Sequence, residues 1–289
     1  MNIVFFGASK FVYPLLDALS KKYTVSLIVT TETNEHEAVS TYAKKHGIPL
    51  LSVKKIDDYS IERIRAEQAK LAVLAYFGII VPKQLLEVFP KGIINTHPSL
   101  LPKYRGPTPV QTALVNGDTV TGVSIMKLDE EIDHGPILAQ AKEPILPTDT
   151  SESLYKKLFT KGATLLSSIV QIIELKGATQ EKPQDHKKAT FTQELTRQSG
   201  YIDSNNPPSP EIIDRMIRAY YPWPGVWTRL KFPDGKEKII KLLPEQKLQV
   251  EGKKPVSYKD FVNGYPMLNL LLIYFFSDLA YATIFQKAH

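Results

Sequence analysis

The chain has 289 residues, with 43% hydrophobic and 23% charged residues, a globular composition with room for one large core and a smaller second domain. The absence of cysteine excludes disulfides, thiol catalysis and zinc or iron–sulfur sites with cysteine ligands. The net charge of +6 comes entirely from residues 151–289, and it indicates either a polyanionic partner such as RNA or a solvated basic surface. Charge alone favours the solvated surface.

The N-terminal residues have neither the basic segment nor the long apolar segment of a secretion signal, so we expect a cytoplasmic protein that begins with a strand. Strand-like and helix-like segments then alternate, which predicts an α/β fold with an open, mostly parallel Rossmann-like sheet and helices on both faces. The first turn, Gly7–Phe11, has a single glycine and so gives no support for a dinucleotide cofactor. The predicted segments are strand Asn2–Phe6, helix Pro14–Lys22, strand Thr24–Val29, strand Leu71–Tyr76, helix Val81–Val88, strand Gly92–Asn95, helix Val110–Val115 and strand Thr121–Leu128.

The second half of the chain begins with a long amphipathic helix at Thr150–Leu175, which Gly177 ends. Two polar, proline-containing segments follow, and they predict a linker at 186–210 between a catalytic domain at 1–185 and a shortened C-terminal β-rich domain at 211–289. The elements predicted for that domain are helix Glu211–Tyr221, a hairpin of Val226–Phe232 and Lys238–Leu243, strand Lys247–Val250 and helix Ser257–Asn263.

The C-terminal tail, Leu268–Phe285, is almost wholly apolar and approaches the length of about 20 residues that spans a membrane. Asp278 in its middle argues against a span. We interpret the tail as a helix buried on the domain or in a dimer interface, and we expect no stable membrane association. For the protein as a whole we expect a monomer.

Three polar side chains carry the predicted chemistry. Asn95 and His97 are two positions apart on a predicted strand, so both project to the same face. An amide and an imidazole can both donate to an oxygen that becomes negative, and a carboxylate beside the imidazole would orient the ring and favour its charged form. Asp133 is the first candidate for that carboxylate, and the neighbouring acids 129–131 are alternatives. With no nucleophile among them, the set would act by holding two substrates together.

The segment Asn95–Gly106 (NTHPSLLPKYRG), with Asp133 placed 36 residues after His97, resembles the signature of the folate-dependent formyltransferases. The similarity extends over roughly Met1 to Gly264, including Asp133–Leu138 and the Pro222–Gly225 segment (PWPG). It is most specific for the branch of this family that acts on methionyl initiator tRNA.

The resemblance implies transfer of a formyl group from 10-formyltetrahydrofolate to the α-amino group of methionine on initiator tRNA, through a tetrahedral intermediate and without a metal. Asn95 and His97 would stabilise the oxyanion, while Asp133 would hold His97 charged and help to remove the amine proton. Arg105 would face the tRNA or the folate tail. The folate donor would bind at Ser99, Leu100, Leu101, Pro102, Tyr76, Phe77 and Gly78.

Two departures from the family pattern keep other functions open. Thr30–Val39 is short and acidic where relatives acting on tRNA carry a long basic loop, and little sequence separates Trp227 from Lys247 in the C-terminal barrel. The missing loop favours an amino-sugar nucleotide N-formyltransferase of the same fold, which the PWPG segment and the basic C-terminal half oppose. A non-catalytic tRNA- or folate-binding protein is a third candidate, which the intact Asn95, His97 and Asp133 oppose.

Overall fold

The computed structural model describes residues 1–32 and 36–268, which form two compact units. Of the described residues, unit 1 contains Met1–Pro109, Thr119–Ile145 and Glu152–Gln193, and unit 2 contains Val110–Asp118, Leu146–Ser151 and 194–268. This division differs from a linker at 186–210. Residues up to 193 belong to unit 1 because the backbone of Arg105 pairs with that of Phe191, and residues from 194 belong to unit 2, where Ile202 lies in the core.

Unit 1 is built on a seven-stranded sheet in the order β3-β2-β1-β4-β5-β6-β7. The first five strands in that order are parallel, and β6 and β7 are antiparallel to their neighbours, so the predicted fold class is confirmed. The strands are β1 Asn2–Phe6, β2 Thr24–Thr31, β3 Leu50–Val53, β4 Leu71–Leu74, β5 Ile93–His97, β6 Val120–Lys127 and β7 Ile137–Pro144. The helices of this unit are α1 Tyr13–Ser20, α2 His36–His46, α3 Asp58–Arg65, α4 Lys83–Leu86 and α6 Ser151–Lys176.

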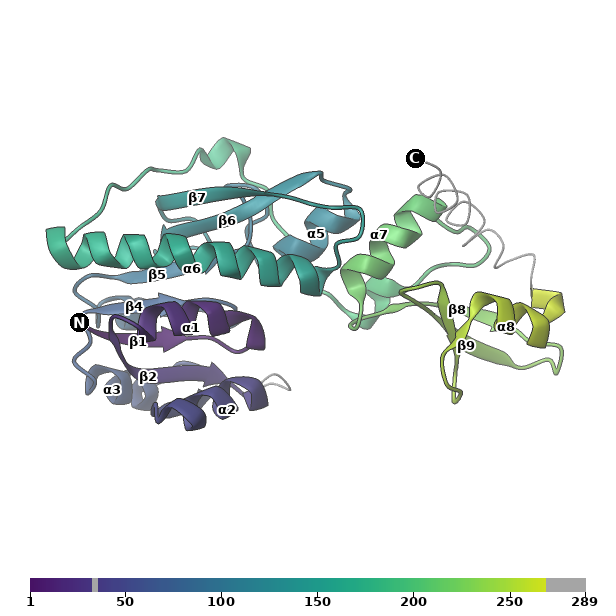
Figure 1. Ribbon diagram of the computed structural model, residues 1–289, viewed down its shortest axis with the longest axis horizontal. Coiled ribbons are helices and arrows are strands. Elements are labelled where there is room, and N and C mark those ends of the chain that lie inside the picture. Colours follow the sequence, from purple (N-terminus) through teal and green to yellow (C-terminus); the bar gives the residue numbers. More distant parts are fainter. Residues whose placement is uncertain (33–35, 269–289) are drawn as a thin grey trace. The chain divides into compact units, whose positions relative to one another are not determined.

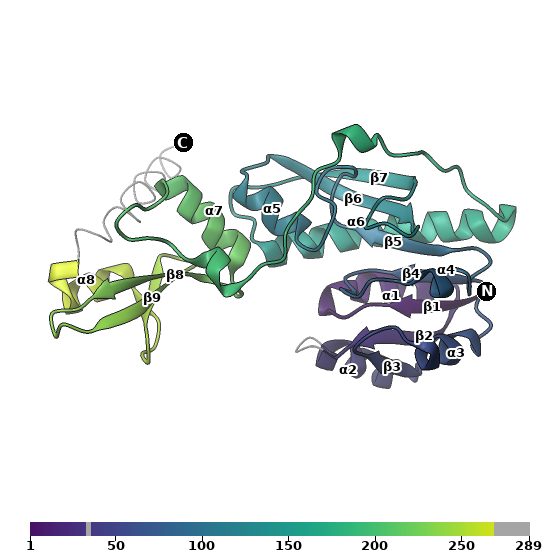
Figure 2. The same ribbon diagram turned by 180° about the vertical axis from the view of Figure 1, so that it is seen from behind.

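Helices cover both faces of this sheet, with α1 and α6 on one face (Figure 1) and α3 and α4 on the other (Figure 2). Alternation along the strands divides the apolar side chains between the two layers. Ile93 of β5, for example, packs with Leu85 and Phe89 on the α4 face. On the other face, α6 approaches β5 closely at Gly162, where a Cβ would lie 3.0 Å from Thr96 Cγ2.

By length and apolar composition alone, α6 could cross a membrane. Its apolar residues recur at helical spacing, however, and Leu158, Phe159, Leu166 and Val170 are each fully buried within the protein. This one-sided burial is typical of the core helix of a globular domain.

The described part of unit 2 contains a four-stranded antiparallel sheet in the order β11-β10-β9-β8 and the helices α5, α7 and α8. Its core includes Ile213 and Ile217 of α7, Ile240 and Leu242 of β9, and Phe261 of α8. The bounds are α5 Pro109–Val115, α7 Pro210–Tyr220, β8 Val226–Lys231, β9 Glu237–Leu243, β10 Lys247–Val250, β11 Val256–Ser257 and α8 Tyr258–Gly264.

Several elements differ from the sequence prediction. The helix expected at Val81–Val88 is one turn long, α4 Lys83–Leu86. It ends there because the amide of Val88 bonds to the carbonyl of Leu85, three residues earlier, and does not continue the α-helical pattern. The elements α2, α3, β3 and β7 are not among the predicted segments. β7 lies at the sheet edge and alternates half-buried with exposed residues, so it lacks an apolar run. The segment Thr33–Glu35 of the short loop and residues 269–285 of the apolar tail lie outside the described residues.

Candidate active site

The strand β5 holds Asn95 and His97 on one face of the sheet in unit 1. Both side chains follow Ile93 at two-residue intervals, so they share the face that β5 turns toward α4. Asn95 is 6% exposed and His97 is 5% exposed. They lie at the carboxyl end of β5, where ligands bind in open α/β sheets.

Asp133 reaches this pair from the turn between β6 and β7. Its Oδ1 accepts a hydrogen bond from Asn95 Nδ2 at 3.1 Å, and its Oδ2 lies 3.4 Å from His97 Nδ1. The backbone amide of Gly106 also donates to Oδ2, at 2.8 Å. The structure therefore brings together all three residues of the predicted catalytic set, with one donor on Oδ1 and two nitrogen atoms on Oδ2.

The orientation of the His97 ring is fixed from its other side. Nε2 lies 2.8 Å from the carbonyl oxygen of Tyr104, which can only accept, so Nε2 carries a hydrogen. Nδ1 is thereby directed at the Asp133 carboxylate, beside the amide of Asn95. Asn95 Nδ2 and His97 Nδ1 thus both face the carboxylate of Asp133, and Nδ1 can donate to it only when the imidazole ring carries both hydrogens.

The backbone of Asp133 is in the left-handed region, with φ +48°. This conformation costs a residue other than glycine about 1–2 kcal/mol. Gly135, two residues after Asp133 in the same turn, has no room for a side chain, because a Cβ there would lie 2.1 Å from the carbonyl oxygen of Lys127. Asp tolerates the left-handed region better than most residues with a side chain, and glycine at 135 avoids a clash, so both residues suit the turn.

The residues predicted to contact folate follow two neighbouring parallel strands, β4 and β5, and so lie at the same edge of the sheet. Ser99 and Leu101 are buried, and the Ser99 hydroxyl donates to the carbonyl of Lys103 at 2.6 Å. Phe77 is also buried, in edge contact with Phe6. Leu100, Pro102 and Tyr76 are half-buried, and Gly78 is exposed with φ +74° and open space beside it. Any ligand at this edge would meet these partly exposed positions and backbone groups first.

The sequence is similar to those of known proteins over most of its length. The model of the formyl transferase family matches residues 1–170. The methionyl-tRNA formyltransferase of Chloroflexus aggregans is 40% identical, over 79% of this chain and 76% of its own length. The chain belongs to the methionyl-tRNA formyltransferase family.

Two further similarities concern a sequence relative and a solved structure. The enzyme of the same name from Thermodesulfovibrio yellowstonii is 34% identical over 91% of this chain and 96% of its own length. A sugar N-formyltransferase structure from a Shewanella species aligns with a TM-score of 0.64 over 82% of this chain and 95% of that one. At 20% identity, the second similarity shows the shared fold alone.

Arg105, which lies within the family signature, is directed at Gln184 and His186 inside the protein, and its expected contact with tRNA or the folate tail stays a prediction. The residue is 3% exposed. Its Nη2 donates to Gln184 Oε1 at 2.8 Å and lies 2.9 Å from His186 Nδ1. Sequence reasoning missed Gln184 because it lies in a polar segment without periodicity, where no pattern distinguishes a buried side chain from a solvated one.

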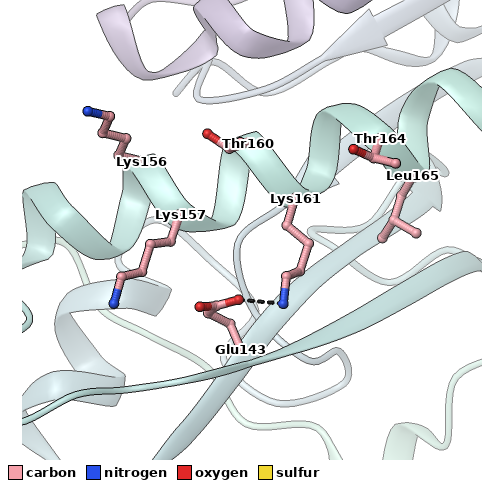
Figure 3. A pocket seen from close by; sticks show the side chains of 7 residues that line it. All are labelled: Glu143, Lys156, Lys157, Thr160, Lys161, Thr164 and Leu165. Carbon is pink, nitrogen blue, oxygen red and sulfur yellow. Dashed lines mark ion pairs between the residues drawn. The ribbon is translucent and has the colours of Figure 1, made fainter.

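A groove on unit 1 lies away from these residues, between β7 and α6 (Figure 3). Lys161 crosses it to form an ion pair with Glu143 and donates to the carbonyl of Lys142. The groove lies along α6, which packs on the sheet face opposite to Asn95 and His97, and none of the predicted site residues line it. Its lining consists of Glu143, Lys156, Lys157, Thr160, Lys161, Thr164 and Leu165.

Proposed function

We propose that this protein transfers a formyl group from 10-formyltetrahydrofolate to the α-amino group of methionyl initiator tRNA. The observation that carries the proposal is the convergence of Asn95 and His97 on Asp133. The chain is also similar, over most of its length, to proteins named methionyl-tRNA formyltransferase. Family membership supports formyl transfer with a folate donor, and the set of relatives supports the acceptor.

In this proposal, 10-formyltetrahydrofolate supplies a formyl group on a nitrogen that can leave. As the amine adds to the formyl carbon, charge develops on the formyl oxygen. Asn95 and His97, which face the Asp133 carboxylate in the structure, would turn toward that oxygen and donate to it. The new carbon–nitrogen bond forms to the amine, and the bond to the folate nitrogen breaks. Asp133 would support a positive charge on His97 and help to pass the amine proton to the departing folate nitrogen.

The protein would also work by holding its two substrates in place, since none of the three residues is a nucleophile. For the donor we propose the edge formed by residues 76–78 and 99–102. The open backbone at Gly78 would admit a flat ring at close range, and the half-buried Leu100 and Pro102 would give it apolar contacts. We expect no metal to take part.

For the tRNA we propose phosphate contacts on the four-stranded sheet of unit 2. Arg229 and Lys231 of β8 and Lys241 of β9 are exposed, and they alternate with the buried Leu230, Ile240 and Leu242. Alternation places the basic side chains on the outer face, where they can neutralise phosphates without reading sequence. Because charged initiator tRNA is a cytoplasmic substrate, we expect the protein to act there, as a monomer.

A competition between acceptors tests the proposal. Purified protein is given 10-formyltetrahydrofolate labelled in its formyl group, with methionyl initiator tRNA, methionyl elongator tRNA and a panel of amino-sugar nucleotides offered together. We expect the label to enter the initiator tRNA. Label found only in a sugar nucleotide would overturn the acceptor assignment but keep the formyl transfer, and label found in no acceptor would overturn both.

A further inference from the structure

A buried glutamine holds the turn that carries Asp133. Gln184 is 6% exposed, and its Nε2 donates to two carbonyl oxygens of that turn, those of Asp133 at 2.8 Å and Gly135 at 2.7 Å. One side chain therefore binds the backbone on both sides of residue 134. The contact spans 51 residues of sequence from Asp133, so it is a purely tertiary restraint.

The amide of Gln184 can adopt only one orientation. Arg105 donates to Oε1 through Nε at 3.2 Å and Nη2 at 2.8 Å, and a guanidinium has no acceptor atom. Oε1 must therefore face Arg105, and both hydrogens of Nε2 are directed at the two carbonyls. Arg105 is itself fixed by backbone hydrogen bonds to Thr190 and Thr192, so the whole connection is rigid.

The segment that contains Arg105 also contacts the carboxylate of Asp133. Gly106, the residue after Arg105, donates its amide to Oδ2. Arg105 and Gly106 thus hold Asp133 twice, through Gln184 at its backbone and directly at its side chain. This double restraint accounts for a non-glycine residue that stays at φ +48°.

We propose that Gln184 is a positioning residue for the transfer reaction, which keeps the Asp133 carboxylate against Asn95 and His97 without touching a substrate. The inference rests on the proposed function. Its physical basis is that a displacement of about 1 Å in a catalytic group can cost roughly 100-fold in rate, whereas binding of the substrates at other residues is unaffected.

Two variants test the role. Gln184→Glu keeps the shape of the side chain and its pairing with Arg105, but it turns a carboxylate oxygen toward the carbonyls of Asp133 and Gly135. Gln184→Met removes all four polar contacts at similar volume. We expect kcat to fall about 10- to 100-fold in both, with KM for either substrate within about two-fold of wild type. Gln171→Met, on the exposed face of α6, is the matched control and should keep wild-type kcat.

A double variant separates positioning from general damage. Asp133→Gly removes the carboxylate and suits the left-handed backbone, so adding Gln184→Glu to it should cause no further loss of the residual rate. A further loss of ten-fold or more in the double variant would show that Gln184 does not act through Asp133. Wild-type kcat in a folded Gln184→Glu protein would also overturn the proposal.

A structural measurement distinguishes failure of this inference from failure of the proposed function. The Gly106 amide reports directly on the Asp133 carboxylate, and its NMR shift and hydrogen-exchange protection can be followed without substrate. We expect both to change in Gln184→Glu and to stay unchanged in Gln171→Met. If wild-type protein formylates no acceptor but the Gly106 amide responds in this way, the function is wrong and the positioning role stands. An unresponsive amide would overturn the positioning role.

Discussion

Replacing Asp133 with asparagine isolates the charge of the proposed catalytic carboxylate. Asparagine is nearly isosteric, and its oxygen can still accept from the Gly106 amide while Asn95 rotates its own amide to suit. What is lost is the negative charge 3.4 Å from His97 Nδ1. With an effective dielectric constant of about 20, attraction between unit charges at that distance is about 5 kcal/mol before any solvent compensation.

Oxyanion-type contributions measured in enzymes are about 2.7–4 kcal/mol, so we expect Asp133→Asn to lower kcat by roughly 10²- to 10³-fold. The assay is single-turnover formyl transfer to methionyl initiator tRNA, with thermal unfolding followed on the same samples. Glu130→Gln is the control, since it removes a charge from an exposed position of the same turn, where Glu130 pairs with Lys83 at the surface. A folded Asp133→Asn protein no slower than Glu130→Gln would refute the role of the carboxylate.

Three further predictions use other parts of the structure. His97→Ala should lower kcat by a similar 10²- to 10³-fold with a shift of only a few degrees in unfolding temperature, and a near-wild-type single-turnover rate would remove His97 from the mechanism. Gly162→Leu should reduce the free energy of unfolding by about 1–3 kcal/mol in urea titrations, because even a Cβ would crowd Thr96 and Val123. Gly264→Ala, where the added Cβ meets open space and φ is not positive, should cost less. Finally, glutamine at the exposed basic positions Arg229, Lys231 and Lys241 of β8 and β9 should weaken tRNA binding. The slope of log K against log salt concentration should become less steep by up to about two to three units. Equal affinities of variant and wild type at low salt would exclude this face.

The elements that could be predicted from the sequence are those with local signals. Apolar runs of β1, β4 and β5 and the helical spacing of α6 identify the fold class, because periodicity depends only on neighbours along the chain. The two-residue spacing of Asn95 and His97 likewise places both side chains on one face of a strand without knowledge of any partner. Family membership followed from the order of residues in the signature, which is also a property of the chain alone.

How these parts meet depends on contacts between segments that are distant in the sequence. The antiparallel return of β6 and the turn before β7 bring Asp133 onto Asn95 and His97, and spacing along the chain cannot specify that approach. The burial of Arg105 and its connection through Gln184 to the backbone of Asp133 depend on contacts across about 50 to 80 residues. Polar side chains in irregular segments look alike in sequence whether they are solvated or buried, since their roles are set by the hydrogen-bond partners that the fold supplies.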